Sequence, residues 1–247
     1  MTKKDNIFKN LIFLDTETTG VEKDDRLFQL AYVFEDKKVD ELFNPQKDIC
    51  IEASETTGYV TKDVKGKEVF ENSKAYQELQ KLLENRENIL VAHNAKFDIR
   101  MLENENLKVP RFIDTLKVAQ KLDTACFFGA YRLQYLRYAM ELEVENAQAH
   151  DALGDVLVLQ ELFQRLYLKM EKQFQNREAI LEEMIKISSE PVLIKKFVFG
   201  KYKGLTVEDV AKQDQGYLEW LLNEKEKQKA EGDVDEDWIY TLNYYLK

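Results

Sequence analysis

The sequence predicts an α/β fold, with a mixed five-stranded sheet flanked by helices and a small module at the C-terminus. Short apolar segments typical of buried strands alternate with segments of helical periodicity in the first part of the chain. The first three strands are joined by connections too short for crossovers, so we expect antiparallel neighbours there, with the later strands joining in parallel. The 247 residues, 44% of them hydrophobic, can bury one sizeable core and a small second unit.

Apolar runs and runs rich in β-formers predict the strands, and charged residues at 35–38 form a hairpin turn between the second and third. The predicted strands are 11–14, 27–34, 39–43, 89–92 and 112–113. Apolar residues at helical spacing predict the helices, the first of them with Ser73 as N-cap. The predicted helices are one opening at Ser73, then 96–105, 131–140, 152–170 and 176–187.

The chain changes character between the long helix and Pro191. We therefore expect one domain over 1–174, a bridging helix and linker over 175–191, and a small module over 192–247 with two or three short helices. The charge-dense stretch 224–237 is expected to be a solvated loop or helix face.

Composition limits the classes of function. The net charge of −10 argues against tight non-specific binding of duplex DNA by the whole surface, although bound cations reverse the sign at a carboxylate-rich site. Cys50 and Cys126 lie at no metal-ligand spacing, so neither a disulfide framework nor a zinc site is indicated. No stretch approaches the roughly 18 apolar residues of a membrane helix, and we expect a cytoplasmic protein with no membrane partner.

Two carboxylates directly follow the first predicted strand. Asp15 and Glu17 come after the apolar run 11–14, and because side chains alternate along a strand they project to the same side. Two such carboxylates at a buried strand end are costly unless a cation lies between them, and Mg²⁺ prefers oxygen ligands. The alternative is a solvated strand end, where Asp, Thr and Gly are common turn residues.

Two further segments place carboxylates at the starts of predicted helices. Asp98 falls in a first helical turn, where an Asp can also simply interact with the helix dipole. Asp155 and His150 belong to the segment that opens the long helix. If both residues belonged to the helix, their side chains would point about 140° apart, because they are five residues apart, and they could not share one site. If His150 instead precedes the helix and Asp151 caps it, His150 and Asp155 can face one cleft.

All four acids, Asp15, Glu17, Asp98 and Asp155, lie at strand ends or helix starts, and such termini can converge on one edge of an α/β sheet. Four carboxylates in one place require about two divalent cations, which stabilise the attacking and leaving oxygens of a displacement at phosphorus. Histidine titrates near neutrality, which suits His150 to proton abstraction from water. The cluster therefore predicts a hydrolytic phosphodiesterase.

Three segments carry these residues: Asp15-Thr-Glu17-Thr-Thr-Gly20, His93-Asn94-Ala95-Lys96-Phe97-Asp98 and His150-Asp151-Ala152-Leu153-Gly154-Asp155. In order and separation they resemble the motifs of the DEDDh 3′–5′ exonucleases, and the resemblance covers residues 8–172. It implies a ribonuclease-H-like core and stepwise release of nucleoside monophosphates from a 3′ end.

The resemblance also implies a role for each residue. Asp15 would bridge two divalent cations, Mg²⁺ or Mn²⁺. Glu17 and Asp155 would complete the cation site on the nucleophile side, and Asp98 would hold the second cation. His150 would be the general base. Candidates for gripping the terminal nucleotide are Thr18, Val21, Phe28, Asn94 and Phe97, of which Val21 and Phe28 could equally be core residues.

The segment from Phe199 to Gly204, with the Tyr-Leu and Trp-Leu pairs that follow it, is similar to a C-terminal module found after exonuclease X-like nucleases. The sequence between residues 192 and 212 contains five lysines and two carboxylates, which gives it a local net charge of +3. Lys201, Tyr202 and Lys203 are therefore candidate DNA contacts, with lysines on phosphate and the aromatic ring on bases. The alternative is that the aromatic residues form a small core and the lysines are solvated.

We therefore expect a metal-dependent 3′–5′ exonuclease that hydrolyses DNA in repair or proofreading. Its partners would be single-stranded or frayed DNA 3′ ends and a DNA polymerase or repair complex. A 3′–5′ exoribonuclease acting on RNA keeps the same chemistry and is the first alternative. The second is a non-catalytic nucleic-acid-binding or polymerase-associated module, which would be expected to lack some of the acids, and none is missing.

Overall fold

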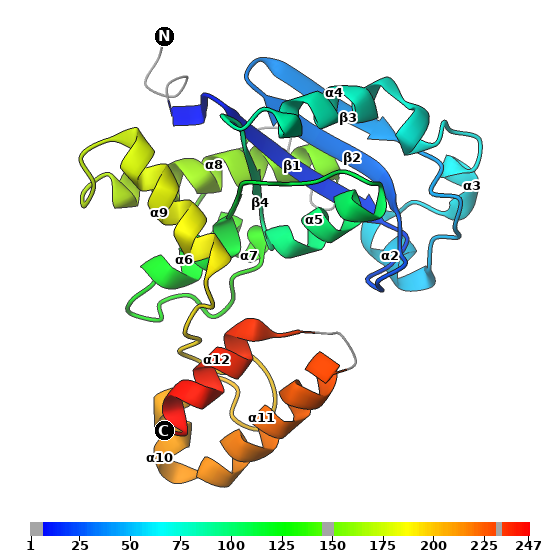
Figure 1. Ribbon diagram of the computed structural model, residues 1–247. Coiled ribbons are helices and arrows are strands. Elements are labelled where there is room, and N and C mark those ends of the chain that lie inside the picture. The colour runs from blue at the N-terminus through cyan, green and yellow to red at the C-terminus, as the bar shows by residue number, and fades with distance from the viewer. Residues whose placement is uncertain (1–6, 145–150, 231–233) are drawn as a thin grey trace.

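The computed structural model describes residues 7–144, 151–230 and 234–247 (Figure 1). Its described part contains one sheet with the strand order β3-β2-β1-β4-β5. Strands β1, β2 and β3 pair antiparallel, while β4 pairs with β1, and β5 with β4, in parallel. The predicted mixed sheet flanked by helices is therefore confirmed. The strands are β1 (Leu11–Thr18), β2 (Leu27–Phe34), β3 (Lys37–Leu42), β4 (Ile89–Ala92) and β5 (Phe112–Asp114).

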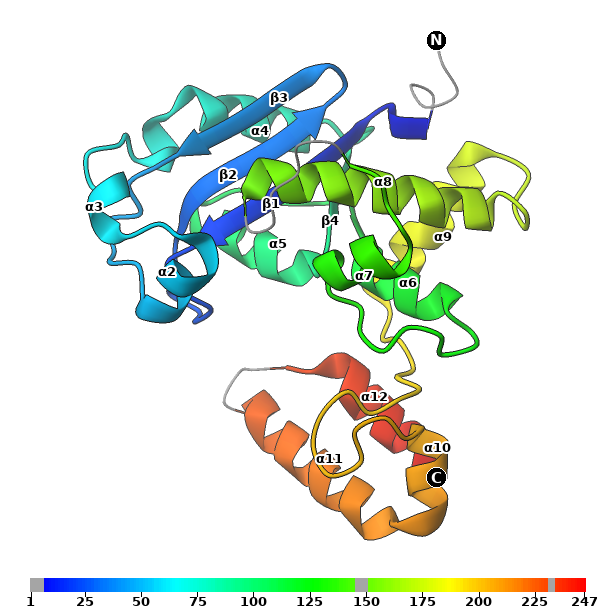
Figure 2. The same cartoon turned by 180° about the vertical axis from the view of Figure 1, so that it is seen from behind.

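Helices cover both faces of this sheet, as Figures 1 and 2 show from opposite sides. The helices of this first domain that the structure describes include α2 (Ile51–Thr57), α3 (Thr61–Val64), the short 3₁₀ helix η1 (Phe70–Asn72), α4 (Lys74–Glu84), α5 (Ala95–Asn104), α6 (Thr115–Leu122), α7 (Leu133–Ala139), α8 (Ala152–Met170) and α9 (Arg177–Ser189). The helices expected after Ser73 and near 96–105, 131–140, 152–170 and 176–187 are all present. Helix α2 was not expected from the sequence because it buries none of its residues and so shows no apolar periodicity.

Alternation along β1 divides the core into two layers. Leu11 and Phe13 pack in the layer under α8, whereas Ile12 and Leu14 pack in the layer that includes residues of α4 and α5. All four are buried. This alternation decides where later side chains of β1 lie, because odd-numbered positions face α8 and even-numbered positions face α5.

Helix α9 lies within the segment expected to bridge two units. Its residues Ile180, Leu181, Met184 and Ile187 are buried in the same layer as Phe13 and α8. Helix α9 therefore contributes to the core of the first domain before the chain leaves it. The division of the chain at residues 174 and 191 stays a prediction.

The C-terminal module has its own small core. Helices α10 (Val207–Gln213), α11 (Gln215–Ala230) and α12 (Glu236–Tyr245) surround a buried cluster that includes Phe197, Leu218 and Trp238. Helix α11 continues to Ala230, so the first half of the charge-dense stretch 224–237 is helical. Among the described residues, none of the helices is both long and apolar enough to cross a membrane.

Polar contacts join the module to the first domain. Lys117 Nζ lies 3.3 Å from Asp237 Oδ1, and the backbone N–H of Val192 donates to the same oxygen at 2.8 Å. Lys96 on α5 forms an ion pair with Glu236 at 2.5 Å. The module therefore packs beside α5 and α6, below the sheet in Figure 1.

Candidate active site

The strand β1 carries the first two carboxylates of the site at its C-terminal end. Asp15 and Glu17 occupy odd positions, so both project to the face covered by α8. Their register partners on β2 are Ala31 and Gln29, and the pairing becomes irregular directly after Glu17. The strand thus presents two acids where the regular ladder ends.

Helix α8 brings the third carboxylate to the same place. Asp151 caps this helix by accepting a hydrogen bond from the Gly154 N–H at 3.1 Å, which places Asp155 in the first turn. Helix α8 packs on β1 and β2. One carboxylate oxygen from each of Asp15, Glu17 and Asp155 lies within 4.8 Å of the others.

The fourth carboxylate approaches from the opposite layer. Beyond Phe13, β1 has no register partner on β4, and Asp98 of α5 occupies part of that place. Its Oδ1 accepts hydrogen bonds from the Thr16 N–H at 3.1 Å and from the Thr16 hydroxyl at 2.8 Å. Asp98 is buried, and its charge acts on Asp15 and Glu17.

Burial and neighbouring charges raise the pKa values of three of the four acids. Burial first, and then the charges of Asp98, Glu17 and Asp155, hold the pKa of Asp15 well above its ordinary value. Burial followed by the charges of Asp155 and Asp98 raises the pKa of Glu17 to about 8. Burial raises the pKa of Asp98 to about 7 against the hydrogen bonds from Thr16.

This carboxylate set fits a divalent cation. Ionising several buried acids within one small volume is unfavourable unless positive charge offsets it. Asp15, Glu17 and Asp155 all supply oxygen ligands, which suits hard cations such as Mg²⁺. Together these residues form a candidate metal centre.

Of the two histidines, the structure describes only His93. His150 lies outside the described residues, next in sequence to the helix cap Asp151. His93 follows β4, where its Nδ1 lies 2.9 Å from the Thr115 hydroxyl and its Nε2 lies 2.7 Å from the Tyr131 carbonyl oxygen. Burial lowers the pKa of His93 to about 4, so this ring is a neutral structural group with Nε2–H donating to Tyr131.

The loop after β1 is shaped by a buried carboxylate. Asp25 accepts hydrogen bonds from the Thr19 hydroxyl at 2.7 Å and the Glu22 N–H at 2.8 Å, and it pairs with Lys47 at 2.8 Å. A Cβ on Gly20 would lie 2.5 Å from the Asp25 carboxylate. Only glycine therefore fits at position 20 without displacing Asp25.

A pocket of about 690 Å³ opens beside the acids along this loop. Thr18, Val21 and Phe97, three of the predicted nucleotide contacts, line it together with Glu17. Val21 is 71% exposed, so it is a surface residue and not part of the core. The Thr18 hydroxyl already donates to the Gly20 carbonyl at 2.6 Å, which leaves its methyl group for contact.

The remaining two predicted contacts differ from each other. Asn94 is exposed at the start of α5, with a left-handed backbone (φ 64°) held by a 3.0 Å hydrogen bond from its N–H to Asp114. Phe28 corrects the prediction: its side chain is 0% exposed, packed with Ile49 and Val64 and edge-on to Tyr59. In this structure Phe28 is a core residue and offers no surface to a nucleotide.

In the C-terminal module, the predicted DNA contacts separate into two groups. Lys201 pairs with Asp214 at 3.1 Å, and the Tyr202 hydroxyl donates to the same carboxylate. The Tyr202 ring packs on Phe197 in the small core. Lys203 instead is exposed beside a second pocket.

Sequence reasoning missed two supporting residues. Gln134 on α7 donates a hydrogen bond from Nε2 to Asp155 Oδ1, and Thr16 holds Asp98 as described above. Thr16 lies inside a motif, and its place between two acids could have drawn attention to it. Gln134 is 21 residues away from its partner, and no local pattern marks it.

Comparison with known proteins agrees with this geometry. A family model described as "Exonuclease" matches residues 12–163, and one described as "Exodeoxyribonuclease X-like C-terminal" matches residues 197–226. The chain is 31% identical to Exodeoxyribonuclease 10 of Escherichia coli (strain K12) over 158 residues, which span 64% of this chain and 64% of that protein. The chain therefore matches just under two thirds of the length of this relative.

Two further proteins are similar over the first domain. DNA polymerase III subunit epsilon of Rickettsia prowazekii (strain Madrid E) is 29% identical over 171 residues, covering 62% of this chain and 71% of that protein. The solved structure of exonuclease X in complex with 5′ overhanging duplex DNA shares the fold, with a TM-score of 0.54, 24% identity, and coverage of 72% of this chain and 99% of that one. Since the first family model spans more than half of the sequence, the chain belongs to the exonuclease family.

Proposed function

We propose that this protein is a metal-dependent 3′–5′ exonuclease that removes nucleotides from DNA 3′ ends as nucleoside 5′-monophosphates. Carboxylate oxygens of Asp15, Glu17 and Asp155 converge within 4.8 Å, beside a pocket of nucleotide size, and this geometry is the main support for phosphodiester hydrolysis. A site built to bind nucleic acid without cleaving it would not need several buried acids whose pKa values are raised.

Each acid has a proposed role in holding cations. Asp15, central in the cluster, would contact two divalent cations, with Glu17 and Asp155 on one and Asp98 toward the other. Two Mg²⁺ or Mn²⁺ ions, when bound, supply positive charge for the attacking and leaving oxygens of a displacement at phosphorus. Hydrogen bonds from Thr16 hold the Asp98 carboxylate in a fixed orientation, and a hydrogen bond from Gln134 does the same for the Asp155 carboxylate.

The protein's own groups would then position the terminal nucleotide and move a proton. Phe97 and Val21 on the pocket wall offer apolar surface to the terminal base and sugar. His150 would take the proton from the attacking water as general base. In the sequence, His150 directly precedes Asp151, the cap of α8, and lies five residues before Asp155.

DNA is the proposed substrate because the C-terminal segment matches a module described as exodeoxyribonuclease X-like, and because Exodeoxyribonuclease 10 is a relative. RNA is the alternative substrate. The same acids would cleave either, so the choice depends on contacts to the sugar.

A 5′-labelled DNA oligonucleotide, incubated with the protein and Mg²⁺, tests the polarity, and a uniformly labelled copy of it tests the product. We expect the 5′-labelled strand to give a ladder that shortens by single nucleotides, and the uniformly labelled strand to release a labelled product that co-migrates with nucleoside 5′-monophosphates. Immediate release of the 5′ label as a mononucleotide would contradict the polarity. Faster turnover of the matched RNA would replace DNA with RNA as the substrate.

The role of His150 is tested by the pH dependence of the rate. We expect turnover by the wild-type protein to fall as the imidazole is protonated, and His150→Gln to lose about 10²- to 10⁴-fold in kcat together with that pH limb. A variant with wild-type kcat, or with an unchanged acidic limb, would assign the proton transfer to another group.

A further inference from the structure

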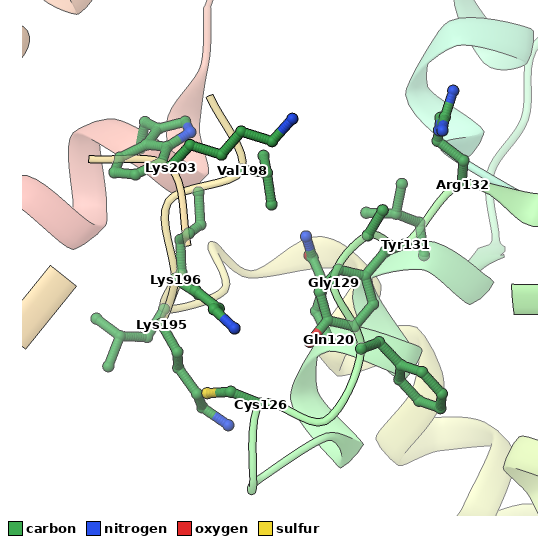
Figure 3. Close-up of a pocket in the computed structure, with 15 residues that line it drawn as sticks. Gln120, Cys126, Gly129, Tyr131, Arg132, Lys195, Lys196, Val198 and Lys203 are labelled. Carbon is green, nitrogen blue, oxygen red and sulfur yellow. The ribbon is translucent and has the colours of Figure 1, made fainter. Parts of the chain in front are cut away.

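A second pocket lies where the C-terminal module meets the first domain, apart from the acidic cluster. Its volume is about 420 Å³. Figure 3 shows Lys195, Lys196 and Lys203 of the module on one wall, with Gln120 and Arg132 of the first domain on the other. The pocket is therefore formed jointly by both parts of the chain.

All the charged residues that line this pocket are cationic. Arg132, Lys195, Lys196 and Lys203 line it, and none of the other lining residues is an acid. This occurs in a chain whose net charge is −10. A concave surface with one sign of charge concentrates counter-ions of the opposite sign, so the ligand it fits is an anion.

Three of the four cations are available to such a ligand. Lys195 donates to the Asp123 carbonyl at 2.9 Å. In the part of the chain that the structure describes, no carboxylate lies within ion-pair distance of Arg132, Lys196 or Lys203. Lys201 differs, because Asp214 already neutralises it.

Apolar and aromatic groups form the rest of the lining. Phe128 and Tyr131 lie edge to face with ring centroids 6.2 Å apart, and the Tyr131 hydroxyl is anchored to Asp123 at 2.8 Å. Aromatic rings beside unpaired cations are the combination that binds single-stranded nucleic acid, with rings on bases and cations on phosphates. A small inorganic anion would make no use of aromatic rings in the lining, so the pocket is better suited to a strand that carries both bases and phosphates.

The pocket is also connected to the acidic cluster. Arg132 occupies the position directly before α7, and Gln134, two residues later, contacts Asp155. Two residues span at most about 7 Å. Next to Arg132, the Tyr131 carbonyl accepts a hydrogen bond from His93, which follows β4. A strand with its 3′ end among the acids could therefore reach this pocket within a few nucleotides.

The two walls of the pocket are held in place. Lys195 of the module binds the Asp123 carbonyl of the first domain, and Lys117 pairs with Asp237. The Ile194 N–H donates to the Thr241 hydroxyl at 2.8 Å, which ties the lining segment to α12. These contacts fix the lysines opposite Arg132.

We propose that this pocket binds a single-stranded DNA segment, upstream of the 3′ end that occupies the acidic cluster, through its phosphates and one base. The proposal rests on the proposed exonuclease function. A pocket of this volume takes a nucleotide-sized group, which a single strand can present and a base-paired duplex cannot. The module would thus hold the substrate between successive cleavages.

The test uses the full chain with Lys196→Gln and Lys203→Gln combined. The matched control combines Lys81→Gln and Lys108→Gln, which remove the same charge at two exposed positions on the α4 and α5 side of the sheet. Binding of a labelled oligonucleotide of about 15 nucleotides is measured in Ca²⁺, and its hydrolysis and that of a dinucleotide are measured in Mg²⁺. Circular dichroism checks that both variants are folded.

We expect the pocket variant to bind the long oligonucleotide about fivefold to tenfold more weakly than the wild type. The slope of the logarithm of the binding constant against the logarithm of the salt concentration should become shallower by about 1.4, which is ~0.7 for each lost phosphate contact. Its KM for the long substrate should rise while kinetics on the dinucleotide, which reaches only the acidic cluster, stay at the wild-type level. The control variant should match the wild type.

Equal behaviour of the two variants would overturn the proposal, as would an equal loss of binding to a blunt duplex. Failure of the proposed function gives a different result. The wild type would then hydrolyse neither substrate, while the binding measurement in Ca²⁺ would still show whether the pocket holds the strand.

Discussion

Thr16 donates two hydrogen bonds to one oxygen of Asp98, from its backbone N–H at 3.1 Å and from its hydroxyl at 2.8 Å. Thr16 lies between the two acids of β1, on the opposite face of the strand. The same strand thus supplies two carboxylates to the site and positions a third from α5. This explains how an acid from the other core layer reaches the cluster.

Replacing Thr16 with valine should weaken both the fold and the site. The side chain keeps its shape and loses the donor, so buried Asp98 keeps the hydrogen bond from the Thr16 backbone and loses the one from the Thr16 hydroxyl. We expect the free energy of unfolding to fall by about 1–3 kcal/mol and the Mg²⁺ concentration for half-maximal activity to rise. Urea denaturation and a Mg²⁺ titration of activity measure the two effects.

Thr124→Val is the matched control, because Thr124 is exposed in the loop after α6. It should leave both measurements unchanged. A Thr16→Val protein as stable and as active as this control would mean that the hydroxyl contributes nothing to holding Asp98.

Gly20→Ala should disturb the loop beside the nucleotide pocket. The added methyl group would lie 2.5 Å from Asp25, so the carboxylate must move away from Thr19, Glu22 or Lys47. We expect a loss of about 1–3 kcal/mol in stability and a higher KM for substrate. Gly66→Ala is the control, since a Cβ there meets no atom within 4 Å; equal effects of the two substitutions would refute the packing argument.

Stability without metal should depend on pH in an unusual direction. The folded-state pKa values of Glu17, about 8, and Asp98, about 7, exceed their ordinary values, so between about pH 4 and 8 the folded protein binds more protons than the unfolded chain. Stability therefore falls as pH rises through this window. A bound cation favours the ionised acids and reverses that trend.

We therefore expect Mg²⁺ to raise the melting temperature more at about pH 8 than at about pH 5.5. Differential scanning fluorimetry with and without Mg²⁺ measures the shift. Glu17→Gln should reduce the difference between the two pH values. A Mg²⁺-induced shift independent of pH would contradict cation binding by these acids.

Below about pH 6.5, His93 should have the opposite effect to Glu17 and Asp98, because it lowers the stability of the fold as the pH falls. Its folded-state pKa of about 4 lies below the ordinary value, so the unfolded chain gains a proton first as pH falls below about 6.5. The stability present above that pH is lost progressively toward pH 4. His93→Gln keeps a neutral donor and acceptor. Between pH 7.5 and 4.5, we expect the free energy of unfolding of this variant to fall by about 1–2 kcal/mol less than that of the wild type.

Urea denaturation at the two pH values gives that difference directly. Asn85→Gln, a substitution of one neutral side chain for another at the end of α4, should show the wild-type pH dependence. If His93→Gln also did so, the ring would not be held neutral by its contacts with Thr115 and Tyr131.

Local signals predicted the acids, while tertiary packing decided what surrounds them. Asp15 and Glu17 follow an apolar run, and Asp98 and Asp155 open helices, so each is visible in a short window of sequence. Gln134 meets Asp155 only because α7 packs on α8. No periodicity contains that information.

Phe28 shows a second limit of the sequence. The family resemblance made Phe28 a candidate nucleotide contact and left a core role equally open, and residues 49–64 decide the question because they pack over the start of β2 and bury Phe28 with Ile49 and Val64. The burial depends on a segment whose helix α2 has no buried residue and so gave no sequence signal. The C-terminal lysines were likewise visible as a positive segment, but only the fold separates Lys201, which pairs with Asp214, from Lys203, which does not.

The central claim is that the carboxylates of β1 drive phosphodiester hydrolysis with divalent cations. The most direct measurement is the initial rate of nucleotide release from a DNA 3′ end in Mg²⁺ by the wild type, Asp15→Asn and the control Asp36→Asn, whose exposed acid lies in the turn between β2 and β3. We predict that Asp15→Asn loses at least about 10³-fold in rate while Asp36→Asn keeps the wild-type rate. An Asp15→Asn protein that retains Mg²⁺-dependent hydrolysis near the wild-type rate would contradict it.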